Sequence, residues 1–275
     1  MATAPYADRE VTQPPDWHEL VVWDFLFNAG TTGLFLVAAV ADLLRPDLFA
    51  PAARWAYPVA LVLLGIDLLF LVLDLGHPAR FHHMLRVVKP SSPMSLGTWC
   101  LTAYSLPLTV AAAASLFGWD ELRRLAAGLG LLPAVGSVLY KGVLFSTSAQ
   151  PGWRDARWLG AYHTASALAL GAAGLLVLSA ADGAEKLRPA VAVLVILGGV
   201  ALERLLVELT PALARRYPGW VTTAVGLPVT LAALPVGLLL VGRRPADAAA
   251  FALVAVSAWA VRAVVVRLPQ RPHPS

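Results

Sequence analysis

Long apolar stretches separated by short polar breaks run along almost the whole chain. A membrane-spanning helix needs roughly 20 predominantly apolar residues. Eight stretches have about this length: residues 20–44, 55–75, 96–117, 122–145, 159–180, 187–209, 221–241 and 248–266. The pattern therefore predicts an all-α, polytopic membrane protein with eight transmembrane helices. Because eight is an even number, we expect both termini on the same side, which we call side A.

The breaks between the stretches contain the residues typical of turns and of membrane interfaces. Tryptophans lie within a few residues of the expected helix ends, as an aromatic belt requires: Trp55, Trp99, Trp119, Trp153, Trp158 and Trp220. Residues 1–19 are rich in proline and charge and lack the basic start and apolar core of a cleavable signal peptide. We expect an extramembrane segment at 1–19, a transmembrane domain at 20–268 and a short tail at 269–275.

Composition agrees with a chain whose solvent is largely lipid. Hydrophobic residues make up 58% of the chain, charged residues only 14%, and the mean hydropathy is +0.69. A soluble domain carries about 25% charged residues. The net charge of +4 is spread over many short loops, which indicates contact with membrane lipid and not with nucleic acid. We expect a multi-pass protein of the inner (plasma) membrane. Lysines and arginines are divided almost evenly between the two sides, so orientation stays open.

Few residues are suited to hold a metal or a haem. Cys100 is the single cysteine, and one thiolate cannot hold an iron–sulfur cluster or a structural zinc. Only His163 lies clearly inside an expected span, whereas membrane haems are usually held by histidines on facing helices. The loop histidines His77, His82 and His83 have no carboxylate or thiolate at ligand spacing. We therefore expect no metal, haem or cluster in this chain, and electrons would have to reach it from another subunit.

Polar residues inside the expected spans gather toward side A. From the ~1.5 Å rise per helical residue, Asn28 and Asp67 lie roughly 12 Å below that surface, and Tyr140 and Lys141 roughly 6–8 Å below it. Glu203 is expected in the same layer. The opposite half shows little that is comparable, with Asp42 and Asp247 at helix ends.

Each of these residues also has a purely structural interpretation. Asp24 and Arg262 lie close enough to an interface to snorkel or to cap a helix. Asn28 is four residues from Asp24, on one helical face, and could simply join helices. Tyr140 could belong to the aromatic belt, and His163 could be a satisfied histidine of the bundle. Because polar groups from four spans converge at one depth, we favour a pocket for an amphipathic, lipid-soluble substrate such as a quinone.

Two segments expected on side A carry specific motifs. Residues 74–85 read DLGHPARFHHML and residues 90–99 read PSSPMSLGTW. Residues 140–146 read YKGVLFS, followed by PGW at 151–153. Together they resemble the signature of the NrfD/PsrC family, the integral membrane subunit of polysulfide-reductase-like molybdopterin oxidoreductase complexes. The resemblance covers most of the chain in span number and order, and its motifs lie in the first 153 residues.

The resemblance implies eight spans in two four-helix bundles and a function in exchanging electrons with menaquinone or ubiquinone. Such subunits carry no haem or cluster and dock a ferredoxin-like iron–sulfur subunit, which connects to a molybdopterin catalytic subunit. Their quinone pocket lies near the docking face, and its positions correspond to Asn28 and Tyr140, with Thr31 and Thr32 close by. A histidine frequent in the first span of the family is absent here; His18 lies just before that span.

These expectations give three sets of candidate residues. The quinone would be hydrogen-bonded by Asn28 and Tyr140 beside Thr31 and Thr32. A buried carboxylate suits a proton carrier, because loss of water disfavours its charged form; the candidate relay is Asp67, Lys141, His163 and Glu203. The candidate docking loops contribute Asp74, His77, Arg80, His82, His83, Arg86 and Trp153.

Two other functions remain open at this point. The chain could be a structural anchor that holds a soluble oxidoreductase at the membrane without binding quinone. It could also transport a small solute, although the expected polar groups do not continue through the opposite half. If the chain exchanges electrons with quinone, we expect it to be a subunit of an oxidoreductase complex whose catalytic centre lies in another subunit.

Overall fold

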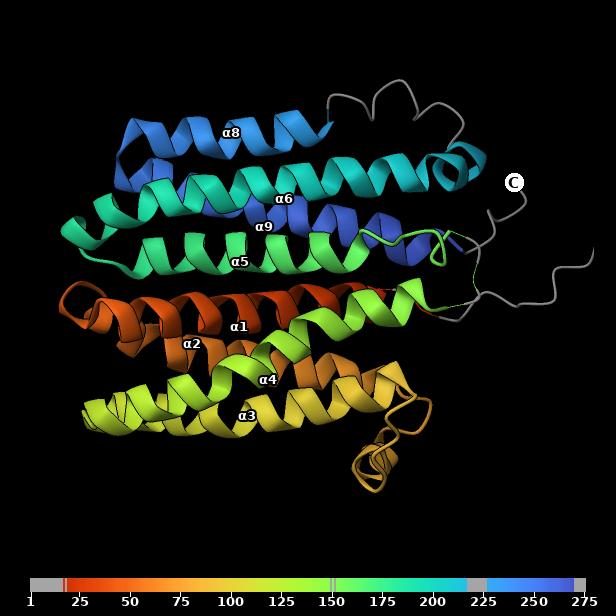
Figure 1. The fold of residues 1–275 in the computed structure, drawn as a ribbon, viewed down its shortest axis with the longest axis horizontal. Helices are drawn as coiled ribbons and strands as arrows, with labels where there is room; N and C mark the ends of the chain where they lie inside the picture. The colour runs from red at the N-terminus through yellow and green to blue at the C-terminus, as the bar shows by residue number, and fades with distance from the viewer. Residues whose placement is uncertain (1–16, 18, 149, 151, 217–226, 270–275) are drawn as a thin grey trace, which may run out of the picture.

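The computed structural model describes residues 17, 19–148, 150, 152–216 and 227–269, and these fold into helices without strands. Figure 1 shows long helices lying side by side, successive ones running in opposite directions. The helices are α1 (Glu19–Leu44), α2 (Pro46–Leu73), the short 3-10 helix η1 (Pro78–Leu85), α3 (Pro93–Phe117), α4 (Asp120–Ser146), α5 (Leu159–Leu178), α6 (Ala181–Arg216), α8 (Leu227–Val241) and α9 (Arg244–Arg267).

Seven of the described helices are long and apolar enough to cross a membrane: α1, α2, α3, α4, α5, α6 and α9. The expected span at 221–241 is described only from residue 227, as the 15-residue apolar helix α8. Because the described fold is all-helical and seven of its helices can cross a membrane, the chain is a multi-pass membrane protein. The full set of eight spans stays a prediction, because residues 217–226 lie outside the described part.

Two helices begin well before the bounds that the sequence predicted. We placed residues 45–54 in a break, but α2 begins at Pro46 and continues through Pro51 and Pro58. Proline in the first helical turn costs no hydrogen bond, and its fixed φ favours the helix. Similarly, α6 begins at Ala181 and has 36 residues, a length of about 54 Å. It therefore exceeds the ~30 Å hydrocarbon core and extends beyond it.

The first and last described helices meet at one end of the molecule. Arg267, at the end of α9, forms an ion pair with Glu19, at the start of α1. We identify this end, on the right in Figure 1, with side A, and call the opposite end the far end. Most of the expected segment 1–19 and of the expected tail 269–275 lies outside the described residues, so the side of the termini themselves stays a prediction.

Helices α1 and α5 form the central contact of the structure. In Figure 1, α2, α3 and α4 lie on the side of α1, and α6, α8 and α9 on the side of α5. The two central backbones touch: a Cβ on Gly33 would lie 1.9 Å from the carbonyl oxygen of Ala167. Small residues allow such close packing in membranes, where helices associate through van der Waals contact. The arrangement agrees with the implied pair of four-helix bundles, which stays a prediction while part of the α8 region is undescribed.

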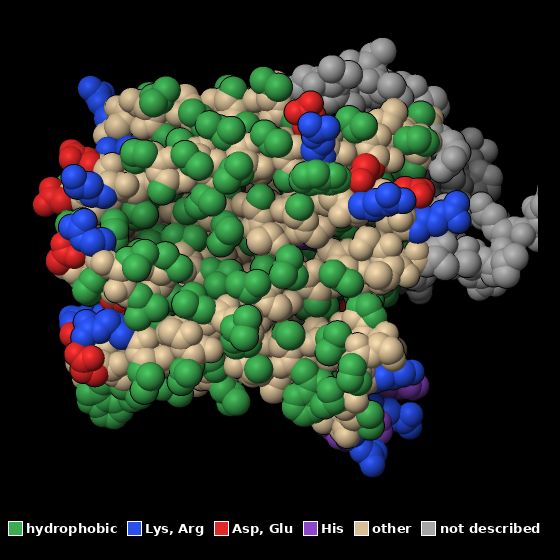
Figure 2. Space-filling view, in the orientation of Figure 1, with side chains coloured by type: hydrophobic (Ala, Val, Ile, Leu, Met, Phe, Trp, Pro, Cys, Tyr) green, Lys and Arg blue, Asp and Glu red, His purple; other side chains and the backbone are tan. Residues whose placement is uncertain are grey.

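The surface separates apolar and charged residues by position along the helices. Figure 2 shows hydrophobic side chains over the long sides of the molecule and most charged side chains gathered toward its two ends. Large apolar side chains point outward midway along the helices, such as Leu132, which is 81% exposed. Outward-facing leucines are expected where the surrounding solvent is lipid.

Candidate functional site

A buried polar cluster lies between α1, α2 and α4, toward side A. The Asn28 amide nitrogen donates to the Asp67 carboxylate at 3.1 Å and to the Ser137 hydroxyl oxygen at 3.3 Å. All three side chains are at most 2% exposed. The amide therefore fixes the orientation of a carboxylate that has no contact with water.

Lys141 joins two carboxylates of this cluster. Its ammonium lies 2.7 Å from Oδ2 of Asp24 and 3.5 Å from Oδ1 of Asp67. It also donates to the backbone carbonyl of Asp24 at 3.2 Å and lies 5.1 Å from the centre of the Phe25 ring. Two carboxyl groups thus share one buried ammonium. Since charges in the membrane are costly unless paired, the cluster is suited to hold or release a proton.

The spacing along α1 and α4 explains how the cluster assembles. Asp24 and Asn28 are four residues apart on α1, and Ser137 and Lys141 are four residues apart on α4. Residues four apart lie on one helical face. Helix α2 runs back beside α1 and brings Asp67 to the depth of Asn28.

The two motifs of the sequence meet at Tyr140. Its ring packs directly on Gly97 of α3: a Cβ at Gly97 would lie 2.0 Å from the ring. The ring centre also lies 5.8 Å from the Lys141 ammonium. Because Gly97, the glycine of SPMSLGTW, has no side chain, it leaves the space that the Tyr140 ring fills beside the polar cluster.

The two threonines near Asn28 are already hydrogen-bonded inside the protein. Thr31 donates to the Ala60 carbonyl at 2.7 Å and lies 2.8 Å from the Tyr104 hydroxyl, so it links α1 to α2 and α3. Thr32 donates to the Asn28 carbonyl of its own helix at 2.6 Å. Both threonines are fully buried.

The structure separates the remaining relay candidates from the cluster. His163 is 4% exposed and meets the Phe25 ring edge-on at 4.9 Å, on the side of that ring toward α5. Its Nε2 atom has no hydrogen-bond partner in the described part of the chain. Glu203 lies on an exposed face of α6, outside the cluster. The structure thus brings together Asn28, Asp67, Tyr140 and Lys141, with Asp24 added and Glu203 left out.

The docking candidates fall into two groups. The residues in and beside η1 are exposed and form a basic surface at side A, visible in blue and purple at the lower right of Figure 2: His77, Arg80, His82, His83 and Arg86. Trp153, by contrast, is 1% exposed and donates to the Val265 carbonyl at 2.6 Å. Trp153 packs the interior, and Asp74 is half-buried at the end of α2.

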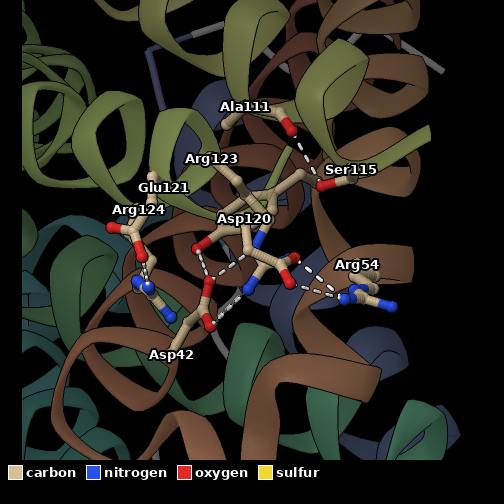
Figure 3. A network of polar contacts seen from close by, with 9 residues as sticks. Asp42, Arg54, Ala111, Ser115, Asp120, Glu121, Arg123 and Arg124 are labelled. Carbon is tan, nitrogen blue, oxygen red and sulfur yellow. Dashed lines mark hydrogen bonds and ion pairs between the residues drawn. The ribbon is translucent and has the colours of Figure 1, made fainter. Parts of the chain in front are cut away.

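The prediction that the far half contains little polar chemistry was wrong. Asp42 and Arg123 form a fully buried ion pair there, with N–O distances of 2.8 and 3.0 Å. Tyr57 donates to the same carboxylate at 3.3 Å. Arg123 also pairs with Asp120, which accepts two hydrogen bonds from Arg54 at 2.8 and 2.9 Å (Figure 3). Arg123 is fully buried although it stands one turn from the start of its helix, where arginines usually reach water.

The sequence left open whether the Arg262 side chain reaches the membrane surface or is buried. In the structure it is buried, with 1% exposure.

Comparison with known families gives one match. The family model described as "Polysulphide reductase, NrfD" matches residues 10–260. No curated protein sequence matches the chain.

Proposed function

The chain belongs to the polysulphide reductase NrfD family, and from this premise we propose that it exchanges electrons between the membrane quinone pool and an iron–sulfur partner subunit. The family supplies membrane subunits of quinone-linked oxidoreductases. In this proposal the chain binds menaquinone or ubiquinone near side A. The partner carries the electrons onward to a molybdopterin catalytic subunit.

The polar cluster around Lys141 is the observation that carries the proposal. Oxidation of a quinol to a quinone releases two electrons and two protons. The electrons pass to the iron–sulfur cluster of the partner subunit, and the protons need a base within hydrogen-bond reach. Asp24 and Asp67 supply two carboxyl groups at one ammonium, so one of them can take the two protons in turn, passing the first to water at side A before it accepts the second, while the other keeps Lys141 paired.

We assign different tasks to Tyr140 and Asn28. The Tyr140 hydroxyl is the hydrogen-bond donor for a quinone carbonyl, because the ring is half-buried beside Lys141. The Asn28 amide donates to Asp67 and Ser137, so its main task is to position the Asp67 carboxylate. Asn28 is then a positioning residue, and its contact with the quinone is secondary.

The basic surface of η1 is the proposed docking face for the iron–sulfur subunit. It lies at side A, the end of the molecule that also holds the polar cluster. Exposed cations favour an acidic partner and speed its association. A partner bound there would bring its iron–sulfur cluster toward the end of this chain where we propose that the quinone binds.

A structural anchor without a quinone site is the second candidate. One observation favours it: the Asn28 amide already donates to two partners inside the protein. Titration of the purified subunit with a short-chain quinone separates the two functions. Saturable binding that a quinone-site inhibitor displaces supports the quinone function, and its absence supports the anchor.

The direct test uses the complete complex in membranes. Tyr140→Phe removes only a hydroxyl, so we expect normal assembly and at least a tenfold loss of quinol-dependent turnover. Activity with a soluble artificial electron donor should be unchanged, because that route bypasses the membrane subunit. Tyr57→Phe at the far end is the matched control and should keep quinol-dependent turnover. Normal turnover in both Tyr140→Phe and Asn28→Ala would sink the site assignment.

A further inference from the structure

A third buried cation, after Lys141 and Arg123, lies on the other side of α1, and its hydrogen-bond partners are neutral. Arg262 of α9 donates to the Phe25 carbonyl at 3.2 Å, the Ala258 carbonyl at 2.9 Å and the Ser166 hydroxyl oxygen at 3.0 Å. No carboxylate of the described residues forms an ion pair with it. A guanidinium stays charged in proteins. An unneutralised charge at this depth is costly and indicates a function.

The acidic residues of the nearby cluster do not neutralise Arg262. Asp24 and Asp67 both face Lys141, at 2.7 and 3.5 Å. Lys141 and Arg262 bind consecutive carbonyls of α1, those of Asp24 and Phe25. Arg262 therefore has no ion-pair partner among the described residues, and an anion bound beside it would be a direct one.

A small cavity with three polar side chains in an otherwise apolar wall, which we call the polar cavity, lies near Arg262. It has a volume of about 50 Å³ and is lined in part by Tyr162, Ser166, Ser257 and Ala258. Ser166 and Ala258 accept two of the three hydrogen bonds that Arg262 donates, so the guanidinium contacts two residues of the cavity wall without lining the cavity itself. The Tyr162 ring, also in the wall and 4% exposed, has its centre 6.0 Å from the guanidinium carbon. A cavity this size holds a few water-sized groups, such as the head of a carboxylate.

A larger apolar cavity continues from the polar one toward side A. It measures about 210 Å³ and is lined by leucine, valine and alanine side chains of α6, α8 and α9. Leu202 and Leu231 line both cavities. The pair thus forms one amphipathic space, polar at its inner end beside Arg262 and apolar along the rest.

We propose that this space binds a long-chain carboxylate, such as a fatty acid anion drawn from the bilayer. The carboxylate head accepts a hydrogen bond from the Ser257 hydroxyl, because the Ser166 hydroxyl already donates to the His163 carbonyl, and Arg262 is its counter-ion. The apolar chain lies in the second cavity, between α6, α8 and α9. Charge complementarity selects an anion over a neutral quinone, because a quinone carbonyl leaves the guanidinium unneutralised. The proposal stands independently of the quinone site on α1, α2 and α4.

The test measures binding to the full chain in nanodiscs of zwitterionic phosphatidylcholine. Spin-labelled stearate is the probe, and the immobilised fraction of its spectrum reports the bound form. Oleate should displace the probe, whereas methyl oleate, with the same chain and no charge, should displace it at least tenfold less well. A short-chain quinone should also fail to displace it.

Two variants test the two ends of the space. Arg262→Gln removes the charge and should weaken probe binding at least tenfold. Gly198→Leu should block it, since Gly198 lines the polar cavity and a Cβ there meets no atom within 4 Å. Gly237→Leu on α8 is the matched control: its Cβ also meets no atom within 4 Å, and it lines neither cavity. This control should bind like the unmodified protein.

Several results would overturn the proposal. They are an immobilised fraction equal to that of empty nanodiscs, equal displacement by methyl oleate or by quinone, and unchanged binding in Arg262→Gln. If Arg262→Gln does not fold, Gly198→Leu decides on its own, and undiminished binding in that variant rejects the site.

Discussion

Lys141 and Asp24 form the shortest ion pair of the polar cluster, with 2.7 Å between the ammonium and a carboxylate oxygen. The same ammonium stands 3.5 Å from Asp67, on the other side of the cluster. One lysine from α4 thus ties together the carboxyl groups of α1 and α2. The unequal distances make Asp24 the closer ion-pair partner of Lys141, so in the proposed quinone function we assign the proton-accepting role to Asp67.

Removing this lysine should destabilise the protein strongly. Lys141→Met leaves two carboxyl groups buried without a cation, and loss of one partner of a buried pair typically costs about 3–5 kcal/mol. We expect a large fall in the thermal unfolding temperature in detergent. Adding Asp24→Asn should restore part of the loss, because it removes one uncompensated charge. A double variant no more stable than Lys141→Met would contradict the shared-ammonium arrangement.

The contact between Gly97 and Tyr140 gives a second prediction. Gly97→Ala adds a methyl group where a Cβ would lie 2.0 Å from the tyrosine ring, so the ring must move. We expect quinol-dependent turnover of the complex to fall at least tenfold while the amount of assembled complex changes less. Gly128→Ala on α4 is the control, since its Cβ meets no atom within 4 Å. Equal turnover in the two variants would show that the position of Tyr140 does not matter.

Hydropathy along the sequence predicts how deep in the membrane a site residue lies, but not the direction in which its side chain faces. Span order and helical rise fix the depth of a residue, and Asn28, Asp67 and Lys141 were expected in one layer and lie together. Rotation about the helix axis is not fixed where a helix is apolar all round. For that reason Glu203, at a similar expected depth, lies on the outer face of α6 instead of in the cluster.

Burial at helix ends is also hard to predict from sequence. Arg123 and Asp42 each lie near the expected end of a span, where charged residues usually reach water. The structure buries both because Asp42 and Asp120 converge on one guanidinium. Pairing of residues 81 positions apart has no local signal in a single sequence.

The far-end pair gives a third prediction, on stability. Arg123→Gln leaves Asp42 fully buried without its cation, and we expect a loss of about 3–5 kcal/mol in the free energy of unfolding. Arg45→Gln is the control, because Arg45 and Asp47 form an exposed pair, and exposed pairs contribute little to stability. Thermal or chemical unfolding of both variants measures the difference. Equal stability of the two would mean that the buried pair contributes no more than the exposed one.

The basic surface of η1 gives the last prediction, on assembly. Arg80→Glu together with Arg86→Glu reverses two exposed charges at side A, and like charges across an interface repel an acidic partner. We expect less iron–sulfur subunit to co-purify with the variant, and the deficit should shrink as salt is raised, because salt screens exposed charges. Arg243→Glu reverses an exposed charge at the far end and should leave co-purification unchanged. If both variants retain the partner equally, the partner does not dock through the charges of η1, and the docking face has to be sought elsewhere on side A.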